Sequence, residues 1–307
     1  MTKVLVTGGA GFIGSNLVRA LLERGDEVRV LDNFSTGFRG NLDGLDIEIV
    51  EGELRSYERV HNAVRGVDLV FHLGALGSVP RSVQDPLTSS AVNIEGTLNV
   101  LLAARDEGVK RVVYSSSSSV YGTRRELPVT EDLAPDPISP YGVAKLAAER
   151  YCVAFSRVYD SFESVVVRYF NVFGPRQSPH SQYAAVIPLF ISAIDEGRPI
   201  FIDGDGEQSR DFTYVDNVVD GTIRAGHVDG VNGRIFNIAG SAPATVNQVA
   251  DLIGSILGKD VKREHRDPRA GDIRASWADN TAAREALGWE TAVGLEEGLR
   301  RTIAAFS

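Results

Sequence analysis

The sequence predicts an α/β fold, with a doubly wound parallel sheet and a smaller α/β substrate lobe in the C-terminal half. Three observations carry this prediction. Short valine-rich runs alternate with helix-like stretches over the first half of the chain. Strands that alternate with helices form right-handed βαβ units, which build a parallel sheet. After about Tyr169 the alternation breaks up and turns become dense, for example at Gly174-Pro175 and at 203–206.

Each element follows from a local pattern. Continuous apolar runs indicate strands that are buried on both faces. The expected strands are residues 3–7, 27–31, 47–51, 68–73, 111–115 and 164–169. Helical spacing of apolar residues predicts helices at 12–24, 88–107 and 140–159. Later in the chain, Thr245 and Gln248 match a capping box, and we expect Asp279 to cap a short helix that ends near Gly288.

Composition and charge argue against several classes of protein. The 307 residues are 43% hydrophobic, which suffices for a packed core. A net charge of −9 argues against binding to nucleic acid or to an anionic membrane, because phosphates require a basic face. No apolar run is long enough for a membrane span, since Pro188 interrupts the longest candidate. The absence of a hydrophobic leader and the single cysteine, Cys152, lead us to expect a cytoplasmic protein.

The first helix is expected to open a dinucleotide site. Residues 7–14 read TGGAGFIG and lie between the first strand and the first helix. Glycines there permit a tight turn and a close approach of the backbone to a pyrophosphate, as in a Rossmann-type domain. Asp32 follows at the end of the second strand, where a carboxylate accepts hydrogen bonds from ribose and repels a 2′-phosphate. NAD is therefore favoured, although Arg39 downstream could pair with the extra phosphate of NADP.

A group of polar residues in the middle of the chain is expected to be catalytic. Tyr141 and Lys145 share one face of the helix that Ser139 and Pro140 begin. The helix dipole and the lysine ammonium both favour the phenolate, so we expect a lowered pKa that makes Tyr141 a general base. Pairs with this spacing are also common on solvated surfaces. The serine run 115–119 follows the fifth strand, at the sheet edge where ligands bind, and supplies a hydroxyl donor.

At these residues the sequence resembles the extended short-chain dehydrogenase/reductase family, and within it the NAD-dependent nucleotide-sugar 4-epimerases. The resemblance extends over essentially the whole chain. It rests on the glycine motif, on Asp32, on Ser117 three residues before Val120-Tyr121-Gly122, on Tyr141-x-x-x-Lys145, and on the runs RYFN at 168–171, RDF at 210–212 and RAGD at 269–272.

The resemblance implies a role for each matching residue. Ser117, Tyr141 and Lys145 would be catalytic. The implied site for tightly bound NAD comprises Gly8, Gly11, Phe12, Ile13, Gly14, Asp32, Asn33, Leu54, Leu73, Ala75, Asn93, Tyr141 and Lys145. The implied UDP-sugar site comprises Gly77, Ser78, Ser117, Ser118, Tyr141, Asn171, Gln177, Val186, Phe201, Arg210, Arg269, Asp272 and Ser276. Arginine suits a diphosphate because its fork binds two oxygens at once.

Within these sets the resemblance implies finer roles. Arg210 and Arg269 would hold the diphosphate, and Asp272 would meet the uridine ribose. Phe201 could stack on uracil or could be an ordinary core residue. The five histidines show no ligand spacing, so no metal is expected.

The division of the chain follows from the same matches. We expect residues 1–172, with about 212–240, to form the NAD-binding Rossmann domain. Residues of about 173–211 and 241–307 would form the UDP-sugar-binding lobe. A homodimer is expected through the helices at 88–107 and 140–159.

The serine run bears on the reaction. Related dehydratases have Thr-Asp-Glu in place of Ser117-Ser118-Ser119, and related decarboxylases have Glu at the position of Ser119. Elimination requires a carboxylate as acid and base, which serine cannot replace. The resemblance therefore favours inversion at C4 of the sugar through a transient 4-keto intermediate.

A single position is expected to select the sugar. In the family, the residue before Trp277 gates the substituent at C2, and a tyrosine there excludes an acetamido group. Here it is Ser276, and Gly77 and Gln177 could line the same space. We therefore expect interconversion of UDP-GlcNAc and UDP-GalNAc, with UDP-Glc and UDP-Gal also accepted. The alternatives are a UDP-glucose 4-epimerase proper, a UDP-glucuronate 4-epimerase or decarboxylase-type enzyme, and a non-catalytic NAD-sensing protein.

Overall fold

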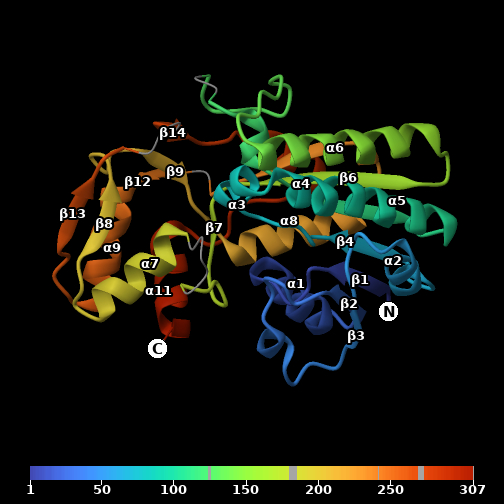
Figure 1. Ribbon diagram of the computed structural model, residues 1–307, viewed down its shortest axis with the longest axis horizontal. Helices are drawn as coiled ribbons and strands as arrows, with labels where there is room; N and C mark the ends of the chain where they lie inside the picture. The colour runs from blue at the N-terminus through green and yellow to red at the C-terminus, as the bar shows by residue number, and fades with distance from the viewer. Residues whose placement is uncertain (124–125, 180–184, 241, 269–272, 307) are drawn as a thin grey trace.

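Seven parallel strands form the central sheet (Figure 1). The computed structural model describes residues 1–123, 126–179, 185–240, 242–268 and 273–306. In spatial order the strands are β11 (Ile235–Ile238), β6 (Glu163–Tyr169), β5 (Arg111–Ser117), β4 (Leu69–His72), β1 (Lys3–Thr7), β2 (Glu27–Asp32) and β3 (Glu48–Glu51). The order reverses beside β1, which is the topological switch point of a Rossmann-type sheet. The predicted fold class is confirmed.

Helices cover both faces of this sheet. One face carries α2 (Tyr57–Val64), α5 (Gly96–Asp106) and α6 (Pro140–Val158), and the other carries α1 (Phe12–Glu23) and α8 (Val215–His227). Side chains alternate between the two cores along each strand. On β1, Val4 and Val6 join the core with α1, whereas Leu5 joins the core with α2. This double burial explains why the strands read as continuous apolar runs.

A further group of elements forms a smaller lobe at the left of Figure 1. Its helices are α7 (Val186–Asp195), α9 (Val246–Leu257) and α11 (Leu295–Phe306). Its short strands are β8 (Ile200–Asp203) with β13 (Arg263–Arg266), and β9 (Ser209–Asp211) between β12 (Pro243–Thr245) and β14 (Ala275–Ser276). A further pair, β7 (Val172–Phe173) with β10 (Thr213–Tyr214), connects this lobe to the sheet.

Three local predictions need correction. The strand β11 was not predicted, because its four residues become a strand only by pairing with β6, which is distant in sequence. The predicted helix at 88–107 is divided into α4 (Pro86–Ser90), a π-helical turn (Ala91–Glu95) and α5. Asp279 is not the N-cap of α10 (Thr281–Leu287). Asn280 is, although Asp279 Oδ1 accepts the Thr281 amide at 2.6 Å.

Two other predictions about helices can be compared with the structure. The capping box of Thr245 and Gln248 at the start of α9 is confirmed. In the part of the chain that the structure describes, no helix has both the length and the apolarity needed to cross a membrane. The helix α3 (Val79–Gln84) and the 3₁₀ turns Arg39–Leu42 and Ser118–Tyr121 complete the elements.

Candidate active site

The loop between β1 and α1 presents bare backbone at the carboxyl end of the sheet. Gly8 has φ of 70°, and a Cβ there would lie 2.7 Å from Gly74 Cα. A Cβ on Gly14 would lie only 2.1 Å from the Gly8 carbonyl oxygen. Glycine is required at both positions so that the loop can turn tightly above α1. The N-cap of α1, Gly11, offers no side-chain acceptor, so the first-turn amides suit an anion such as pyrophosphate.

Asp32 is held at the end of β2 by two backbone amides. Ala10 N–H donates to Oδ2 at 2.9 Å, and Phe34 N–H donates to Oδ1 at 2.8 Å. The carboxylate retains further lone pairs that ribose hydroxyls can use. Arg39 pairs instead with Glu51 at 2.6 Å and stacks 3.9 Å from the centroid of the Phe34 ring. The residues present therefore fit NAD, and the Arg39 guanidinium already contacts Glu51 and Phe34.

Two adjoining cavities follow this edge of the sheet and share five lining residues, among them Gly8, Leu73 and Ala75. The predicted cofactor residues that line the first cavity are Gly8, Gly11, Asp32, Asn33, Leu54, Leu73 and Ala75. Those that line the second, besides the shared ones, are Phe12, Ile13, Gly14, Tyr141 and Lys145. The second cavity also contains Gly77 and Ser78. The second cavity therefore contains residues of both predicted sites.

Asn93 is the predicted cofactor residue that lines neither cavity. It is buried in the π-helical turn, and its side-chain amide spans the backbone of Leu76. Leu76 N–H donates to Asn93 Oδ1 at 2.8 Å, and Asn93 Nδ2 donates to Leu76 O at 3.2 Å. Asn93 therefore holds the loop after β4 in place, which is a structural task that its sequence pattern did not reveal.

The predicted catalytic residues converge where β5 ends and α6 begins. Ser117 ends β5, and Tyr141 and Lys145 lie on the first two turns of α6. Lys145 is 3% exposed, and its Nζ donates to the Ser115 carbonyl at 2.8 Å. The same Nζ lies 6.0 Å from the centroid of the Tyr141 ring. The helix is therefore docked to the strand through its lysine.

The N-terminus of α6 is fixed by two hydroxyl groups. Ser139 caps the helix by accepting the Gly142 amide at 3.1 Å. Ser82, which lies on α3 and is fully buried, accepts the Tyr141 amide at 3.0 Å. Sequence analysis missed Ser82 and the Ser115 carbonyl. No local pattern identifies a serine that reaches another helix, or a carbonyl that binds a lysine.

The prediction that the pKa of Tyr141 is lowered is wrong. Burial raises the pKa of Tyr141, and a hydrogen bond with Ser117 opposes this effect only in part. Burial also lowers the pKa of Lys145 to about 8, although the nearby Glu149 carboxylate raises it. Desolvation dominates at both residues, because a group shielded from water favours its neutral form.

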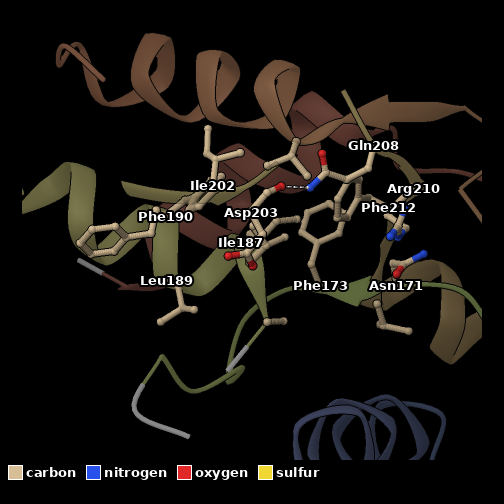
Figure 2. A pocket seen from close by; sticks show the side chains of 15 residues that line it. Asn171, Phe173, Ile187, Leu189, Phe190, Ile202, Asp203, Gln208, Arg210 and Phe212 are labelled. Carbon is tan, nitrogen blue, oxygen red and sulfur yellow. Dashed lines mark hydrogen bonds between the residues drawn. The ribbon is translucent and has the colours of Figure 1, made fainter. Parts of the chain in front are cut away.

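A separate pocket of about 330 Å³ lies in the smaller lobe (Figure 2). The predicted substrate residues that line it are Asn171, Val186, Phe201 and Arg210. Phe201 is 44% exposed, so the interpretation as a core residue is wrong. The guanidinium of Arg266 lies over the Phe201 ring, 3.6 Å from its centroid, so a cation stacks on this aromatic residue of the pocket.

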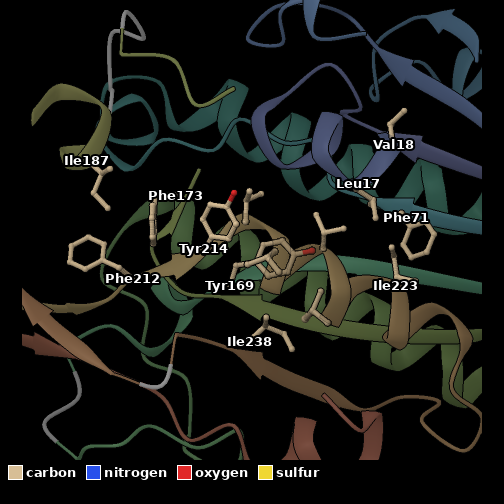
Figure 3. Packing of buried hydrophobic residues seen from close by; sticks show 14 of the residues in the cluster. Leu17, Val18, Phe71, Tyr169, Phe173, Ile187, Phe212, Tyr214, Ile223 and Ile238 are labelled. Atoms are coloured by element: carbon tan, nitrogen blue, oxygen red, sulfur yellow. The ribbon is translucent and has the colours of Figure 1, made fainter. Parts of the chain in front are cut away.

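This pocket is built on the main core. Phe173, Ile187 and Phe212 line it and belong to the buried cluster that reaches Leu17 of α1 (Figure 3). Figure 2 shows the hydrogen bond from Gln208 Nε2 to the Asp203 carbonyl, at 2.8 Å. A pocket on packed side chains is held rigidly relative to the glycine loop, since interiors are close-packed.

The other predicted substrate residues are distributed around these cavities. Ser276 lies on β14 in register with Arg210 of β9. Gln177 donates from Nε2 to the Val172 carbonyl at 3.1 Å, while its Oε1 is buried and has no partner among the described residues. Ser118 begins the 3₁₀ turn after β5. Arg269 and Asp272 lie outside the described residues.

Comparison with known proteins shows similarity over the full length. The sequence model of the NAD dependent epimerase/dehydratase family matches residues 4–239. The UDP-glucose 4-epimerase of Mycolicibacterium smegmatis is 39% identical over 99% of this chain and 98% of its own. The structure of the Thermotoga maritima UDP-glucose 4-epimerase with UDP-glucose has a TM-score of 0.95 and 40% identity, covering 99% of this chain and 98% of that one. The UDP-N-acetylglucosamine 4-epimerase of Methanobrevibacter ruminantium M1, in complex with UDP-N-acetylmuramic acid, has a TM-score of 0.94 and 39% identity with the same coverage.

This chain belongs to the NAD dependent epimerase/dehydratase family, whose members are extended short-chain dehydrogenases/reductases. The predictions of family, fold class, NAD dependence and isomerase class are confirmed at that level. The names of the relatives give different UDP-sugars, so the membership covers UDP-sugar 4-epimerases as a group.

Proposed function

We propose that this protein is an NAD-dependent 4-epimerase that interconverts UDP-GlcNAc and UDP-GalNAc and also accepts UDP-Glc and UDP-Gal. One observation carries the proposal. Tyr141 and Lys145 line the cavity that begins at the glycine loop and ends at Gly77 and Ser78. A dinucleotide on that loop and a sugar beside Gly77 would therefore meet at the Tyr141 hydroxyl. Reacting groups held within contact distance need no further ordering in the reaction.

The cofactor would be held by the first strand-helix unit. The amides at the start of α1 would receive the pyrophosphate, and Asp32 would accept hydrogen bonds from the adenosine ribose. Lys145 would hold the nicotinamide ribose. NAD, when bound, supplies an acceptor and donor of hydride for C4 and a positive charge beside Tyr141.

Tyr141 would take the proton from the sugar 4-hydroxyl and later return it. Its partly buried phenol has a raised pKa, so proton transfer requires positive charge next to the oxygen. Lys145 provides part of that charge, and Ser117 would donate a hydrogen bond to the reacting oxygen. The 4-keto sugar would then rotate in the cavity, so that the hydride returns to the opposite face of C4 as the proton returns to the oxygen. These steps invert C4 without net oxidation.

The cavity chemistry supports inversion over elimination. None of the described residues that line the cavity around Tyr141 is a carboxylate. Dehydration across C5 and C6 requires an acid and a base, and the serines at 117–119 supply neither.

Three features support the acetamido sugars. Ser276 is small and adjacent in register to Arg210, which we propose binds the diphosphate. A Cβ on Gly77 would meet nothing within 4 Å, so there is open space beside it. The buried Oε1 of Gln177 needs a donor, and the amide N–H of an acetamido group would provide one. Arg81 lines the same cavity as Tyr141, which makes UDP-glucuronate the second candidate.

The test is an assay of the purified protein on UDP-GlcNAc, UDP-GalNAc, UDP-Glc, UDP-Gal and UDP-glucuronate, without added NAD. We expect C4 inversion of the first four, and release of NAD when the protein is denatured. Tyr141→Phe should lower kcat by at least ~100-fold with unchanged folding. Tyr57→Phe is the control, because Tyr57 is 40% exposed on α2 and lines neither cavity. Near-wild-type turnover by the Tyr141 variant would overturn the mechanism.

The expected homodimer stays a prediction with structural support. The exposed apolar side chains Val143, Tyr151 and Val158 of α6, together with Leu87 of α4, lie on the helices expected at the interface. A second copy would cover them, and sedimentation of the purified protein should show twice the chain mass. The division into a cofactor domain and a substrate lobe likewise stays a prediction.

A further inference from the structure

A fully buried ion pair lies one helical turn from Lys145. Glu149 of α6 and Arg168 of β6 are both 0% exposed. Arg168 Nε donates to Glu149 Oε1 at 2.9 Å, and its Nη2 donates to Oε2 at 2.8 Å. Because Glu149 follows Lys145 by four residues, both side chains leave the same face of α6 and point at the sheet.

The pair is connected to the end of β5. The Ser116 hydroxyl donates to Glu149 Oε1, and Ser116 is the register partner of Arg168. Ser116 stands between Ser115, whose carbonyl binds Lys145, and Ser117. A single short stretch of strand is thus bonded to α6 twice, once through Glu149 and once through Lys145.

The hydrogen-bond network continues to β11, the strand at the edge of the sheet. Arg168 Nη1 donates to the Tyr121 hydroxyl at 2.8 Å, and that hydroxyl donates to Asn237 Oδ1 at 2.7 Å. Tyr121 lies on the 3₁₀ turn after β5, and Asn237 lies on β11. The pair therefore joins α6, β5, β6 and β11 at one point beneath the predicted catalytic residues.

Stability alone does not explain this arrangement. Burying two opposite charges costs free energy of hydration, and their mutual attraction offsets that cost only when the geometry is good. Apolar residues of similar volume often stabilise a protein as much as a buried ion pair, or more. We propose that the Glu149–Arg168 pair is a positioning device that aligns Ser115 and Ser117 with Tyr141 and Lys145. The proposal rests on the proposed epimerase function and deepens it.

The same two strands contain a matched control. At their amino ends, Arg111 of β5 is 2% exposed and donates from Nε to Glu163 of β6 at 2.7 Å. Arg111 and Glu163 are also register partners. This second pair also joins an arginine to a glutamate and lies away from both cavities, but it links β5 to β6 directly and its Glu163 side chain is 32% exposed. If the Glu149–Arg168 pair served only to hold elements together, its removal would affect kcat no more than removal of this control pair.

The experiment compares two double variants, Glu149→Leu with Arg168→Met and Arg111→Met with Glu163→Leu. Urea midpoint, NAD content, kcat and KM are measured with a UDP-sugar that the wild type epimerises. We expect the first double variant to keep NAD and a midpoint near that of the wild type. Its kcat should fall ~10- to 100-fold with KM within about twofold, because misplacement near the reacting atoms acts on the transition state. The Arg111–Glu163 double variant should keep its kcat.

A milder variant covers the case in which the first double variant does not fold. Ser116→Ala removes the hydrogen bond between the pair and β5 at a position that also lines the cavity around Tyr141, and should lower kcat by ~3- to 10-fold with KM and the urea midpoint unchanged. Wild-type kcat in the folded Glu149–Arg168 double variant or in Ser116→Ala would overturn the proposal, as would an equal loss in the Arg111–Glu163 control. A wild type that inverts none of the UDP-sugars would instead overturn the proposed function itself.

Discussion

Acidification should destabilise this protein through His72, which lies at the end of β4 and is 1% exposed. Its Nε2 is 3.0 Å from the Thr97 hydroxyl, which itself donates to the Asn93 carbonyl at 2.7 Å. Its Nδ1 is 2.7 Å from the Thr7 hydroxyl, which accepts the Gly74 amide at 3.0 Å. Thr97 must therefore accept from Nε2–H, and Thr7 must donate to Nδ1. The hydrogen bonds are complete only when the imidazole is neutral.

The magnitude follows from the pKa of this ring. Burial, with a smaller contribution from the Lys145 charge, lowers the pKa of His72 from 6.5 to about 3. Between these values the unfolded chain binds a proton that the folded protein does not bind. The free energy of unfolding therefore falls as the pH falls, by ~1.4 kcal/mol per pH unit. From pH 6.5 to pH 4.5 the loss due to His72 is about 2 kcal/mol, because the unfolded imidazole is already half protonated at pH 6.5.

The assay is urea unfolding of the wild type and His72→Gln at pH 7 and at pH 4.5. Carboxylates titrate in both proteins, so the difference between the two unfolding free energies isolates His72. That difference should favour the wild type at pH 7 and should shrink by about 2.5 kcal/mol at pH 4.5. A difference for His72→Gln that stays constant between the two pH values would refute the neutral, buried imidazole.

Two further predictions concern selectivity. Ser276→Tyr should lower turnover of UDP-GlcNAc at least ~10-fold relative to UDP-Glc, because a ring at that position would fill the space for the acetamido group; an unchanged ratio in a competition assay would contradict the gate. Asp32→Ser should weaken retention of NAD and reduce the preference for NAD over NADP ~10-fold, because the carboxylate no longer binds ribose or repels a 2′-phosphate. The measurement equilibrates each protein with equal amounts of NAD and NADP, denatures it, and determines the ratio of the two dinucleotides released. An unchanged ratio in the Asp32 variant would contradict the prediction.

The parts of the fold that could be predicted from sequence are those with a local signature. Val4 and Val6 pack on one face of the sheet and Leu5 on the other, so β1 reads as an unbroken apolar run. β11 escaped prediction because four residues gain their strand conformation only by pairing with β6. Its neighbourhood also lacks the alternation that identified the other strands.

The candidate site shows the same limit. Tyr141 and Lys145 could be placed on one helical face because both belong to α6. The Tyr141 pKa could not be predicted, because its direction depends on burial by α3 and β5, and dipoles and charges along one helix do not report burial. Ser82 was missed for the same reason, since its bond to the Tyr141 amide joins two separate helices.

Several buried polar residues of the sheet lie near the carboxyl ends of its strands, at the border of the two cavities. Thr7 ends β1 and His72 ends β4, while Ser116 and Arg168 lie within the last two residues of β5 and β6. An unbonded polar group at such depth destabilises a protein, and each of these side chains is hydrogen-bonded to a neighbouring element. Apolar replacements would still fill the core, but they would release the loops and the helix that border the two cavities. Stability therefore does not account for their placement, whereas a requirement to hold those borders does.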